Sequence, residues 1–479
     1  MDNELTKLKV KMKLLLIKPW EPIVPCIVQP PLGILYLASA CRTRCSDLLD
    51  VEILDAKCLK LSVEEYSDRL ADADIVGISA FNYELPEVGR IAALAKRLDE
   101  NKLIMVGGPC TSSNCQQILA ENETIDWAFD GEAEISLPVA IAAWSHGEIS
   151  NKIPGRWFRR DGKIFGPDEA VSRPDVNELG LPAWDMVRFE DYKAGESPNR
   201  CLKGTRYAPI FSSRGCPYSC AYCHNIFGKK FRPRTAENVV AEIRTLHREF
   251  GVDEIHIEDD IFNLDRKRMA AVFELLARDP GVGKLHFCFP NAMRGDLLDE
   301  ESIDILARGG TFQISVAVET VTPRLQKLIS KNQDIEKVKR AIDLAANRGL
   351  MVESFFMVGF PTETPREIFA TLSYAIRSRL TSTGFFLVVP QPRTELYEMA
   401  KAKDPKALER AESYGYHTSK SWYELSTGFP LNRVKNLALI LFYFTSPRRA
   451  WKLAANIGLK GIANGVKTLL SIVFRGGNP

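Results

Sequence analysis

The sequence predicts an α/β protein of two domains followed by a mainly helical C-terminal region. Over the first 150 residues, short apolar runs alternate with segments of helical spacing, and six more strand–helix units follow between residues 206 and 400. The length of 479 residues is too great for one ordinary domain. We therefore expect domains at 1–150 and 206–400, a linker punctuated by Pro and Gly at 151–205, and a helical region at 401–479.

The first domain is predicted to be a doubly wound parallel sheet. We expect strands at 13–17, 51–54, 75–79, 103–106 and 127–129, and helices at 33–41, 63–70, 87–98, 115–120 and 135–144. Ligands of such sheets bind beyond the carboxyl ends of the strands. Those ends carry Pro30-Pro31-Leu32-Gly33, Asp55, Ser79, Gly107-Gly108-Pro109 and Gly131-Glu132.

The second domain is predicted to be a partial (β/α)6 barrel of the TIM type. Its strands are expected at 210–213, 254–258, 284–289, 313–318, 352–358 and 384–389, each followed by a helical segment. The chemistry of such barrels takes place at the carboxyl ends of the strands.

Composition excludes several classes of protein. The formal net charge is only +2, and no basic stretch is interleaved with aromatic residues, so we expect no nucleic-acid partner. The first ten residues lack the apolar core of a secretory signal, and no apolar run reaches the roughly 20 residues of a membrane-spanning helix. Eleven cysteines, three of them within eight residues, fit a metal site in a reducing compartment. A cytoplasmic protein is therefore expected.

Three cysteines directly follow the first expected barrel strand. Cys216, Cys220 and Cys223 stand in one loop, where three thiolates can hold three irons of a cubane cluster and leave the fourth iron open. The alternative is a zinc knuckle, but zinc prefers four ligands, and only His224 lies close by. The spacing favours a 4Fe-4S cluster.

This loop, CxxxCxxC with an aromatic residue before the last cysteine, resembles the signature of the radical S-adenosylmethionine (SAM) superfamily. The resemblance implies that the open iron chelates the amino and carboxylate groups of SAM. Reductive cleavage, with an electron from an external flavodoxin or ferredoxin, would then yield methionine and a 5′-deoxyadenosyl radical that removes a hydrogen atom from the substrate.

Other strand ends of the barrel agree with this resemblance. Asp259, within Glu258-Asp259-Asp260, stands where many family members contact the SAM amino group with a Gly-Gly-Glu element; a substrate or structural role is the alternative. Glu319 resembles the residue whose carboxylate holds the SAM ribose, although it could be a solvated acid. Gly359 resembles the start of the segment that approaches adenine, although Gly-Phe-Pro could equally form a tight turn.

The glycine-marked strand ends of the first domain resemble the cobalamin-binding, Rossmann-like domain that precedes the barrel in one radical SAM subgroup. The resemblance covers roughly residues 13 to 400 and implies that Asp55, Ser79, Gly107 and Gly108 contact cobalamin. Asp55-Ala56-Lys57 lacks the cobalt-binding histidine of many cobalamin proteins, and the domain's only histidine is His146. Two outcomes are left open. Either the lower face of the bound cobalamin has no histidine ligand, or the domain is degenerate and binds no cobalamin.

The C-terminal tail has a one-sided charge. From residue 431 onward there are eight basic residues and no Asp or Glu. A helix after Pro447 would carry an apolar stripe beginning at Trp451 and flanked by lysines, which suits an anionic membrane surface. Packing of this helix on its own barrel is the alternative.

The combined features predict a cobalamin-dependent radical SAM enzyme that alters an unactivated carbon of a small molecule or lipid, most plausibly by methylation. The resemblance implies that one SAM methylates cobalamin and a second generates the 5′-deoxyadenosyl radical. That radical removes a hydrogen atom from the substrate, and the substrate radical then takes the methyl group from methylcobalamin. Cyclisation, oxidation or carbon–carbon bond formation with the same cofactors is the alternative. A corrinoid or iron–sulfur sensor or assembly protein is an alternative from another class. The sequence assigns no catalytic residue.

Overall fold

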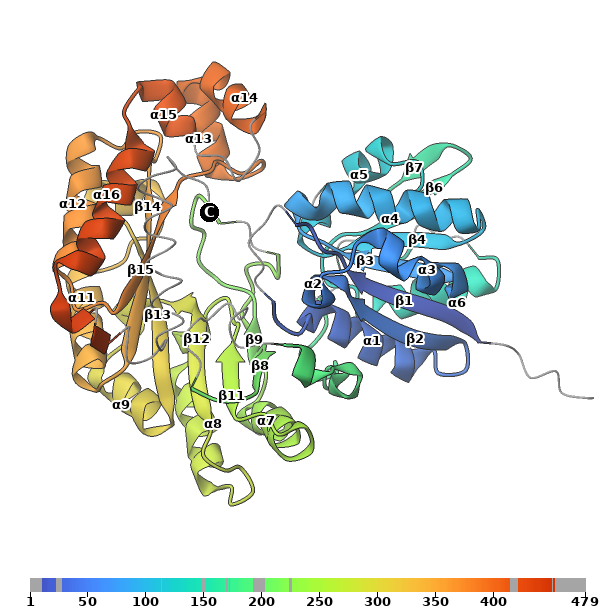
Figure 1. The fold of residues 1–479 in the computed structure, drawn as a ribbon, viewed down its shortest axis with the longest axis horizontal. Coiled ribbons are helices and arrows are strands. Elements are labelled where there is room, and N and C mark those ends of the chain that lie inside the picture. Colours follow the sequence, from blue (N-terminus) through green and yellow to red (C-terminus); the bar gives the residue numbers. More distant parts are fainter. Residues whose placement is uncertain are drawn as a thin grey trace, which may run out of the picture. The chain divides into compact units, whose positions relative to one another are not determined.

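The computed structural model divides the chain into two compact units, Met1–Glu196 and Ser197–Pro479 (Figure 1). It describes residues 11–22, 28–112, 114–148, 152–168, 171, 173–192, 203–223, 226–413, 421–449 and 451–452. Most of the segment expected to be a linker therefore belongs to the first unit.

The first unit is built on a seven-stranded sheet with the strand order β2-β1-β3-β4-β5-β6-β7. The five expected strands are confirmed, and they run parallel: β1 (Met12–Lys18), β2 (Leu49–Asp55), β3 (Ile75–Ser79), β4 (Leu103–Gly107) and β5 (Trp127–Phe129). Helices connect them: α1 (Leu32–Arg44), α2 (Ala56–Leu59), α3 (Ser67–Asp72), α4 (Leu85–Leu98) and α5 (Cys115–Glu121), with α6 (Ser136–Ser145) after the last.

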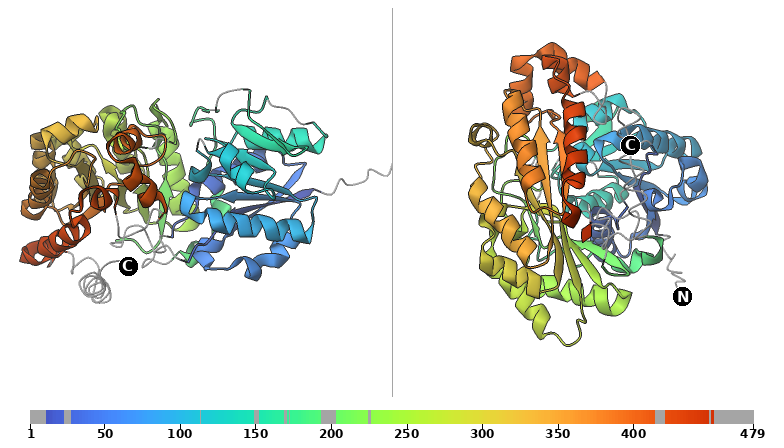
Figure 2. Two further views of the ribbon diagram at one scale, coloured as in Figure 1. Left: turned by 90° about the horizontal axis from the view of Figure 1, so that it is seen from above. Right: turned by 60° about the vertical axis from the view of Figure 1, so that its left-hand side comes forward.

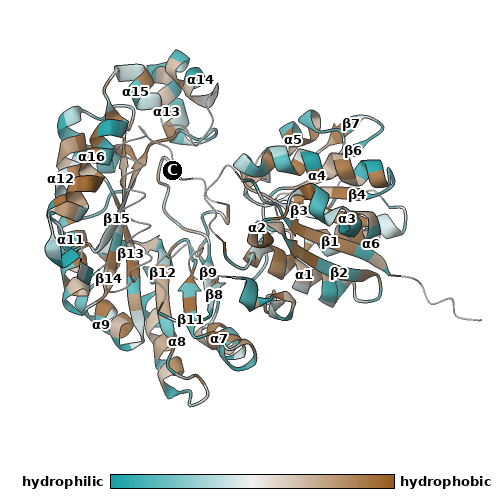
Figure 3. Cartoon of the chain, in the orientation of Figure 1, coloured by the Kyte–Doolittle hydropathy of each residue, from teal (hydrophilic) through white to brown (hydrophobic). Residues whose placement is uncertain are grey.

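Both faces of this sheet are buried, because successive side chains of a strand point to opposite sides. In β1, Leu15 and Ile17 pack with the buried residues of α3, α4 and α5, whereas Leu14 and Leu16 pack with those of α1 and α6. Apolar residues on both sides of one strand are typical of a doubly wound parallel sheet, and Figure 3 shows β1 largely in brown.

Two antiparallel strands extend the sheet within the expected linker. β6 (Arg156–Arg160) pairs with β5, and a turn at Asp161 and Gly162 leads into β7 (Lys163–Phe165). Both turn residues have positive φ, as a two-residue hairpin turn requires. Periodicity is weak in this part of the sequence because both strands are short and β7 forms the edge of the sheet.

The second unit is an open, all-parallel sheet of six strands that follow each other in order (Figure 2). The strands are β8 (Tyr207–Ile210), β11 (Glu254–Ile257), β12 (His286–Met293), β13 (Thr311–Glu319), β14 (Met351–Val358) and β15 (Ser382–Leu387). A helix follows each of the first five strands: α7 (Ala236–Phe250), α8 (Arg266–Arg278), α9 (Glu300–Arg308), α11 (Ile335–Asn347) and α12 (Pro365–Arg377). The expected partial barrel is therefore confirmed.

Each of these five helices starts at a residue whose side-chain oxygen accepts a backbone N–H of the first turn. Such caps satisfy donors that have no partner inside the helix. They are Thr235, Asp265, Asp299, Asp334 and Thr364. The strand-to-helix junctions are thus fixed locally, which positions the loops at the carboxyl ends of the strands.

The first barrel strand begins earlier than expected, at Tyr207 instead of Ile210. The Asp253 carboxylate accepts the backbone N–H of Thr205 and that of Arg206, each at 2.8 Å. These bonds align the chain with the start of β11, so strand pairing begins at Tyr207, opposite Glu254. Beyond Ile210 the chain continues to the two-residue strand β9 (Ser213–Arg214), which pairs with β10 (Arg232–Pro233).

The C-terminal region is helical as expected. It comprises α13 (Glu395–Lys403), α14 (Pro405–Ser413), α15 (Trp422–Thr427) and α16 (Leu431–Phe444). Within the described residues, no helix combines the length and the apolar character needed to cross a bilayer. The predicted apolar stripe continues beyond Trp451 into residues that lie outside the described part of the chain.

Replacing Gly155 by Ala tests whether the β5–β6 junction stabilises the first unit. Gly155 has a φ of +73°, and an added Cβ would lie 2.5 Å from the Asp130 carbonyl oxygen. We expect a loss of about 2 kcal/mol in the free energy of unfolding, measured by urea denaturation. Gly162→Ala is the matched control, because its φ is +71° with no atom within 4 Å. Equal losses in the two variants would contradict the packing at this junction.

Candidate functional site

The cysteine loop lies between β9 and β10 and is anchored at several points. Gly215 precedes it with a φ of +84°, and a Cβ there would lie 2.3 Å from the Lys230 carbonyl oxygen. The Gly215 N–H donates to Asp260 at 3.0 Å. Ala221 N–H donates to the Ile329 carbonyl at 2.9 Å, and the Ala221 carbonyl accepts the Leu396 N–H at 2.9 Å. The loop is therefore held to the second unit on both sides of Cys220.

The three thiols are accessible to a cluster. Cys216 and Cys220 are half-buried and Cys223 is exposed, and none of the three is in a disulfide. Burial raises the pKa of Cys216, so this thiol is protonated until a metal displaces the proton. Within the described residues, no three His, Cys, Asp or Glu side chains are grouped as ligands of a metal ion. His224, which lies close by in the sequence, is outside the described residues.

Glu319 lies at the carboxyl end of β13 and is connected to the cysteine loop. The Tyr222 hydroxyl donates to Glu319 Oε1 at 3.0 Å, and Lys331 Nζ lies 3.2 Å from the same oxygen. Lys331 Nζ also donates to the Tyr222 hydroxyl oxygen at 3.0 Å. Burial, followed by the charge of Glu319, raises the pKa of Tyr222 well above its usual value, so the phenol keeps the proton that it donates.

The backbone at Glu319 is unusual for a non-glycine residue. Its φ is +63°, and the pairing of β13 with β14 shifts register between Ala317 and Glu319. Such a bulge redirects a side chain at a strand end. Glu319 is 7% exposed, so it is not the solvated acid of the alternative interpretation. No described residue bonds to its Oε2, which leaves an acceptor for hydroxyl groups of a ligand.

The three acids after β11 have different surroundings. Asp259 accepts hydrogen bonds from Ser212 N–H at 2.6 Å, Ser212 Oγ at 2.6 Å and Ser213 Oγ at 2.5 Å. This arrangement supports the structural alternative for Asp259, because its carboxylate positions β9 ahead of the cysteine loop. Glu258 Oε1, in contrast, is buried without a partner among the described residues, and burial raises its pKa to about 7. Asp259 was the acid predicted from the sequence to contact SAM, but Glu258 is the acid that could receive a ligand.

Gly359 follows β14 in a turn closed by Glu363. Glu363 Oε2 accepts the Gly359 N–H at 2.6 Å and the Phe360 N–H at 3.1 Å. Gly359 has a φ of +97°, and an added Cβ would lie 2.7 Å from Leu431 Cδ2 and 3.1 Å from Tyr423 Cβ. The tight turn, which the sequence allowed as an alternative, is therefore present. Side chains of Tyr423 and Leu431, from the C-terminal region, fill the space beside the Gly359 Cα.

In the first unit, Ser79 and the two glycines meet at the ends of β3 and β4. The Ala80 N–H donates to the Gly107 carbonyl at 3.1 Å. Gly108 has a φ of +89°, and an added Cβ would lie 2.8 Å from Ser79 Oγ. By contrast, a Cβ on Gly107 or on Gly33 would meet no atom within 4 Å. Gly108 therefore serves the turn, whereas Gly107 and Gly33 leave space for a ligand to approach the backbone.

Asp55 and a buried ion-pair cluster occupy the neighbouring strand ends. Asp55 caps α2 by accepting the Cys58 N–H and also accepts the Tyr192 hydroxyl, each at 2.9 Å. Glu84 is fully buried, forms an ion pair with Lys18 and lies 3.8 Å from Lys57 Nζ. Lys18 and Glu84 were not predicted from the sequence, since only the folded chain brings the end of β1 beside the residues after β3.

Two family models match the two units. Residues 210–375 match the model described as Radical SAM superfamily, and residues 28–141 match the B12 binding domain. The chain belongs to the radical SAM superfamily and carries a B12-binding domain. Radical SAM domains use a 4Fe-4S cluster and SAM, and B12-binding domains bind cobalamin, so the expected cofactors are confirmed.

Relatives of this radical SAM protein include two methyltransferases. An uncharacterized methyltransferase of Pyrococcus horikoshii is 29% identical over 83% of this chain and 84% of its own. The cytidylyl-2-hydroxyethylphosphonate methyltransferase of Streptomyces wedmorensis is 28% identical over 67% of this chain and 66% of its own. The fold is similar to that of the radical SAM methyltransferase TsrM from Kitasatospora setae, solved with cobalamin and a [4Fe-4S] cluster. Its TM-score is 0.65, with 20% identity over 82% of this chain and 78% of that one.

The residues of this radical SAM protein fit its cofactors. The cysteine loop offers three thiols, Glu319 Oε2 offers an acceptor for SAM hydroxyls, and Glu258 offers a carboxyl group at the same edge of the sheet. In the first unit, the open backbone at Gly33 and Gly107 suits a large planar ligand.

The first unit offers cobalamin no histidine at its strand ends. His146, the unit's single histidine, caps the end of α6, which starts beyond β5 and runs back toward the opposite edge of the sheet. The predicted histidine-free lower face is consistent with this position. Cys110, which follows Gly107-Gly108-Pro109, is buried, and burial raises its pKa to about 12, so Cys110 is a packed residue of the core.

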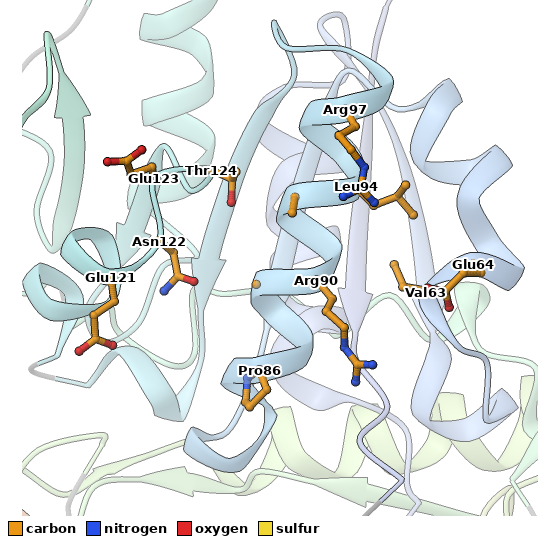
Figure 4. Close-up of a pocket in the computed structure, with 12 residues that line it drawn as sticks. Val63, Glu64, Pro86, Arg90, Leu94, Arg97, Glu121, Asn122, Glu123 and Thr124 are labelled. Carbon is orange, nitrogen blue, oxygen red and sulfur yellow. The ribbon is translucent and has the colours of Figure 1, made fainter.

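A surface groove of about 520 Å³ lies elsewhere on the first unit (Figure 4). It follows α4, with Arg90 and Arg97 along one side and Asn122 and Thr124 near the other. None of the site residues that the sequence predicts lines it, so this groove is not the candidate site.

Replacing Gly107 by Val tests the proposed approach of cobalamin to the first unit. We expect the free energy of unfolding to stay within about 0.5 kcal/mol of wild type, because the space is open. Affinity for hydroxocobalamin, titrated by absorbance on the full chain, should fall roughly tenfold or more, which corresponds to about 1.4 kcal/mol.

Gly108→Ala is the contrasting variant, because the positive φ and the contact with Ser79 should cost about 1–3 kcal/mol of stability. Unchanged cobalamin affinity in Gly107→Val would show that the cofactor does not approach this strand end.

Proposed function

We propose that this radical SAM protein is a cobalamin-dependent enzyme that methylates an unactivated carbon of a small-molecule or lipid substrate. The observation that carries the proposal is the contact of Tyr222, inside the cysteine loop, with Glu319 at the end of β13. It joins the residues that would hold the cluster to the carboxylate that would hold SAM. Relatives named as methyltransferases support methyl transfer, whereas relatives named as anaerobic magnesium-protoporphyrin IX monomethyl ester cyclases support cyclisation as the alternative.

The residues of the second unit would bind and orient two of the cofactors. When bound, the cluster, SAM and cobalamin would supply an electron, a hydrogen-abstracting radical and a transferable methyl group, respectively. Cys216, Cys220 and Cys223 would hold three irons and leave the fourth open. Glu319 would accept the ribose hydroxyls through Oε2, while Lys331 and Tyr222 fix its other oxygen.

The first unit would leave cobalt without a protein imidazole. No histidine stands at the ends of β1 to β4 in the sequence. Without a protein histidine there, cobalamin bound to this unit would supply a methyl group that a carbon radical can take, which suits methylation of an unactivated carbon. Gly33 and Gly107 would admit the corrin close to the backbone.

We infer further that the enzyme works in the cytoplasm with a flavodoxin or ferredoxin as electron donor. None of the nine described cysteines is in a disulfide, which supports a reducing compartment. The name of the Streptomyces relative denotes a small phosphonate substrate, which supports a small molecule for this chain.

A labelling experiment tests methylation directly. The full chain, reconstituted anaerobically with iron, sulfide and hydroxocobalamin, is incubated with dithionite, methyl-deuterated SAM and metabolite extract from cells lacking the gene. We expect a product that gains the labelled methyl group, together with 5′-deoxyadenosine and S-adenosylhomocysteine. A product without label would favour cyclisation or oxidation, whereas absence of 5′-deoxyadenosine despite a full cluster would favour the sensor or assembly protein.

Replacing Glu319 by Gln tests the SAM site separately. The variant loses a charged acceptor, so SAM affinity should fall about 10- to 100-fold while iron content stays at the wild-type level. Equilibrium dialysis of SAM and iron analysis of the reconstituted protein measure both quantities. Glu353→Gln is the control, since Glu353 is a mid-strand acid of β14 that bonds Ser315 at 3.3 Å. Wild-type SAM affinity in Glu319→Gln would contradict the assignment.

A further inference from the structure

One face of α16 carries an exposed apolar stripe. Leu437 is 57% exposed, Leu441 42% and Phe444 75%, and the spacing of four and three residues places them on one side of the helix. Trp451, seven residues on, is 72% exposed. Arg433, four residues before Leu437 on the same helix, is also exposed, and so is Arg448, which together with Trp451 lies beyond the end of α16 at Phe444. We call these six residues the α16 face.

The opposite face of α16 is part of the core. α16 packs against α12 and β15, and its Leu431, Ala438 and Phe442 are buried. In Figure 2, α16 and α12 lie side by side. The α16 face is therefore turned away from the second unit's own sheet.

Arg449 fixes the chain beyond α16. It is 4% exposed and donates to the carbonyl oxygens of Leu380 at 2.9 Å, Ser378 at 3.0 Å and Ile376 at 3.2 Å. Its guanidinium also lies 3.6 Å from the centre of the Phe442 ring. Arg449 thus serves the fold, although the sequence grouped it with the basic residues of the tail.

The α16 face carries positive charge and no acid of its own, and the acid Glu424 accepts the Asn432 N–H at 3.0 Å at the start of α16. Within the described residues, neither Arg433 nor Arg448 forms an ion pair. Lys452 lies near Arg448 and Arg379, and its pKa is lowered by burial and by the positive charges of these two arginines. Three cations are therefore close together near one end of the stripe. Residues 431–479 contain no acid, although the whole chain is nearly balanced with 63 basic and 61 acidic residues.

We propose that the α16 face docks on an anionic membrane surface. The apolar side chains would enter the boundary between headgroups and acyl chains, while Trp451 and the arginines would lie at the level of the lipid headgroups. Docking in this manner needs no membrane-spanning helix.

Two other molecules could cover the α16 face: the chain's own C-terminal residues or a second copy of the chain. Charge complementarity favours an anionic lipid surface over both. The chain's own residues 453–479 add Lys460, Lys467 and Arg475 and no acid, so they would bring like charge against Arg433 and Arg448. A second copy joined by a two-fold axis would face the same arginines toward one another. An anionic lipid headgroup instead complements both the positive charge and the apolar stripe.

Flotation of the full chain with vesicles tests the proposal. We expect binding to phosphatidylcholine vesicles that contain 30% phosphatidylglycerol, and much weaker binding to pure phosphatidylcholine or at 0.5 M salt. Arg433→Ala with Arg448→Ala should weaken partition about fivefold per arginine. Leu437→Ser, Leu441→Ser and Phe444→Ser together should weaken it about 100-fold.

Matched controls separate this surface from general effects. Leu98 is 44% exposed on the first unit and Arg340 is exposed on α11, so Leu98→Ser and Arg340→Ala should bind vesicles like wild type. Circular dichroism confirms that each variant is folded. Undiminished vesicle binding in the triple serine variant would overturn the proposal. Equal binding to anionic and neutral vesicles would also overturn it. A third contrary result would be a wild-type chain that binds no vesicles but self-associates, with the triple serine variant unable to self-associate.

Discussion

The hydrogen bond from the Tyr222 phenol to the Glu319 carboxylate connects segments 97 residues apart, and the candidate site of the second unit depends on it. Tyr222 belongs to the cysteine loop, whereas Glu319 ends β13. Lys331 closes a triangle with both side chains, which supplies the positive charge that a nearly buried carboxylate requires. The loop that would carry the cluster is thereby held at the strand end where the ribose of SAM would bind.

Backbone geometry prepares both units for ligands in the same physical way. Parallel strands end at one edge of a sheet, and residues there are free to leave regular pairing. Glu319 does so through a register shift and a positive φ, and Gly215 through a turn that no Cβ would fit. In the first unit, Gly108 makes the turn while Gly107 leaves its backbone open. The two adjacent glycines therefore have different tasks, although their sequence context is the same.

Local sequence predicted the features that depend on local physics. Buried parallel strands are continuous apolar runs, so β1 to β5 and the six barrel strands were found, and the spacing of Cys216, Cys220 and Cys223 indicated a cluster loop. Lys331 and Glu84 were not found, because an isolated charged residue carries no sign of the partner that folding brings to it. For the same reason the sequence could not distinguish Asp259, which bonds Ser212, from Glu258, whose Oε1 has no described partner.

The most direct test of the radical SAM assignment is the formation of 5′-deoxyadenosine by anaerobically reconstituted wild-type chain and by Cys220→Ala, with SAM and dithionite. The wild type should show the charge-transfer absorbance of a 4Fe-4S cluster and form 5′-deoxyadenosine. Cys220→Ala should lose both, because two remaining thiolates cannot hold three irons. Retention of the cluster and of product formation in Cys220→Ala, or no product from a fully loaded wild type, would contradict the account.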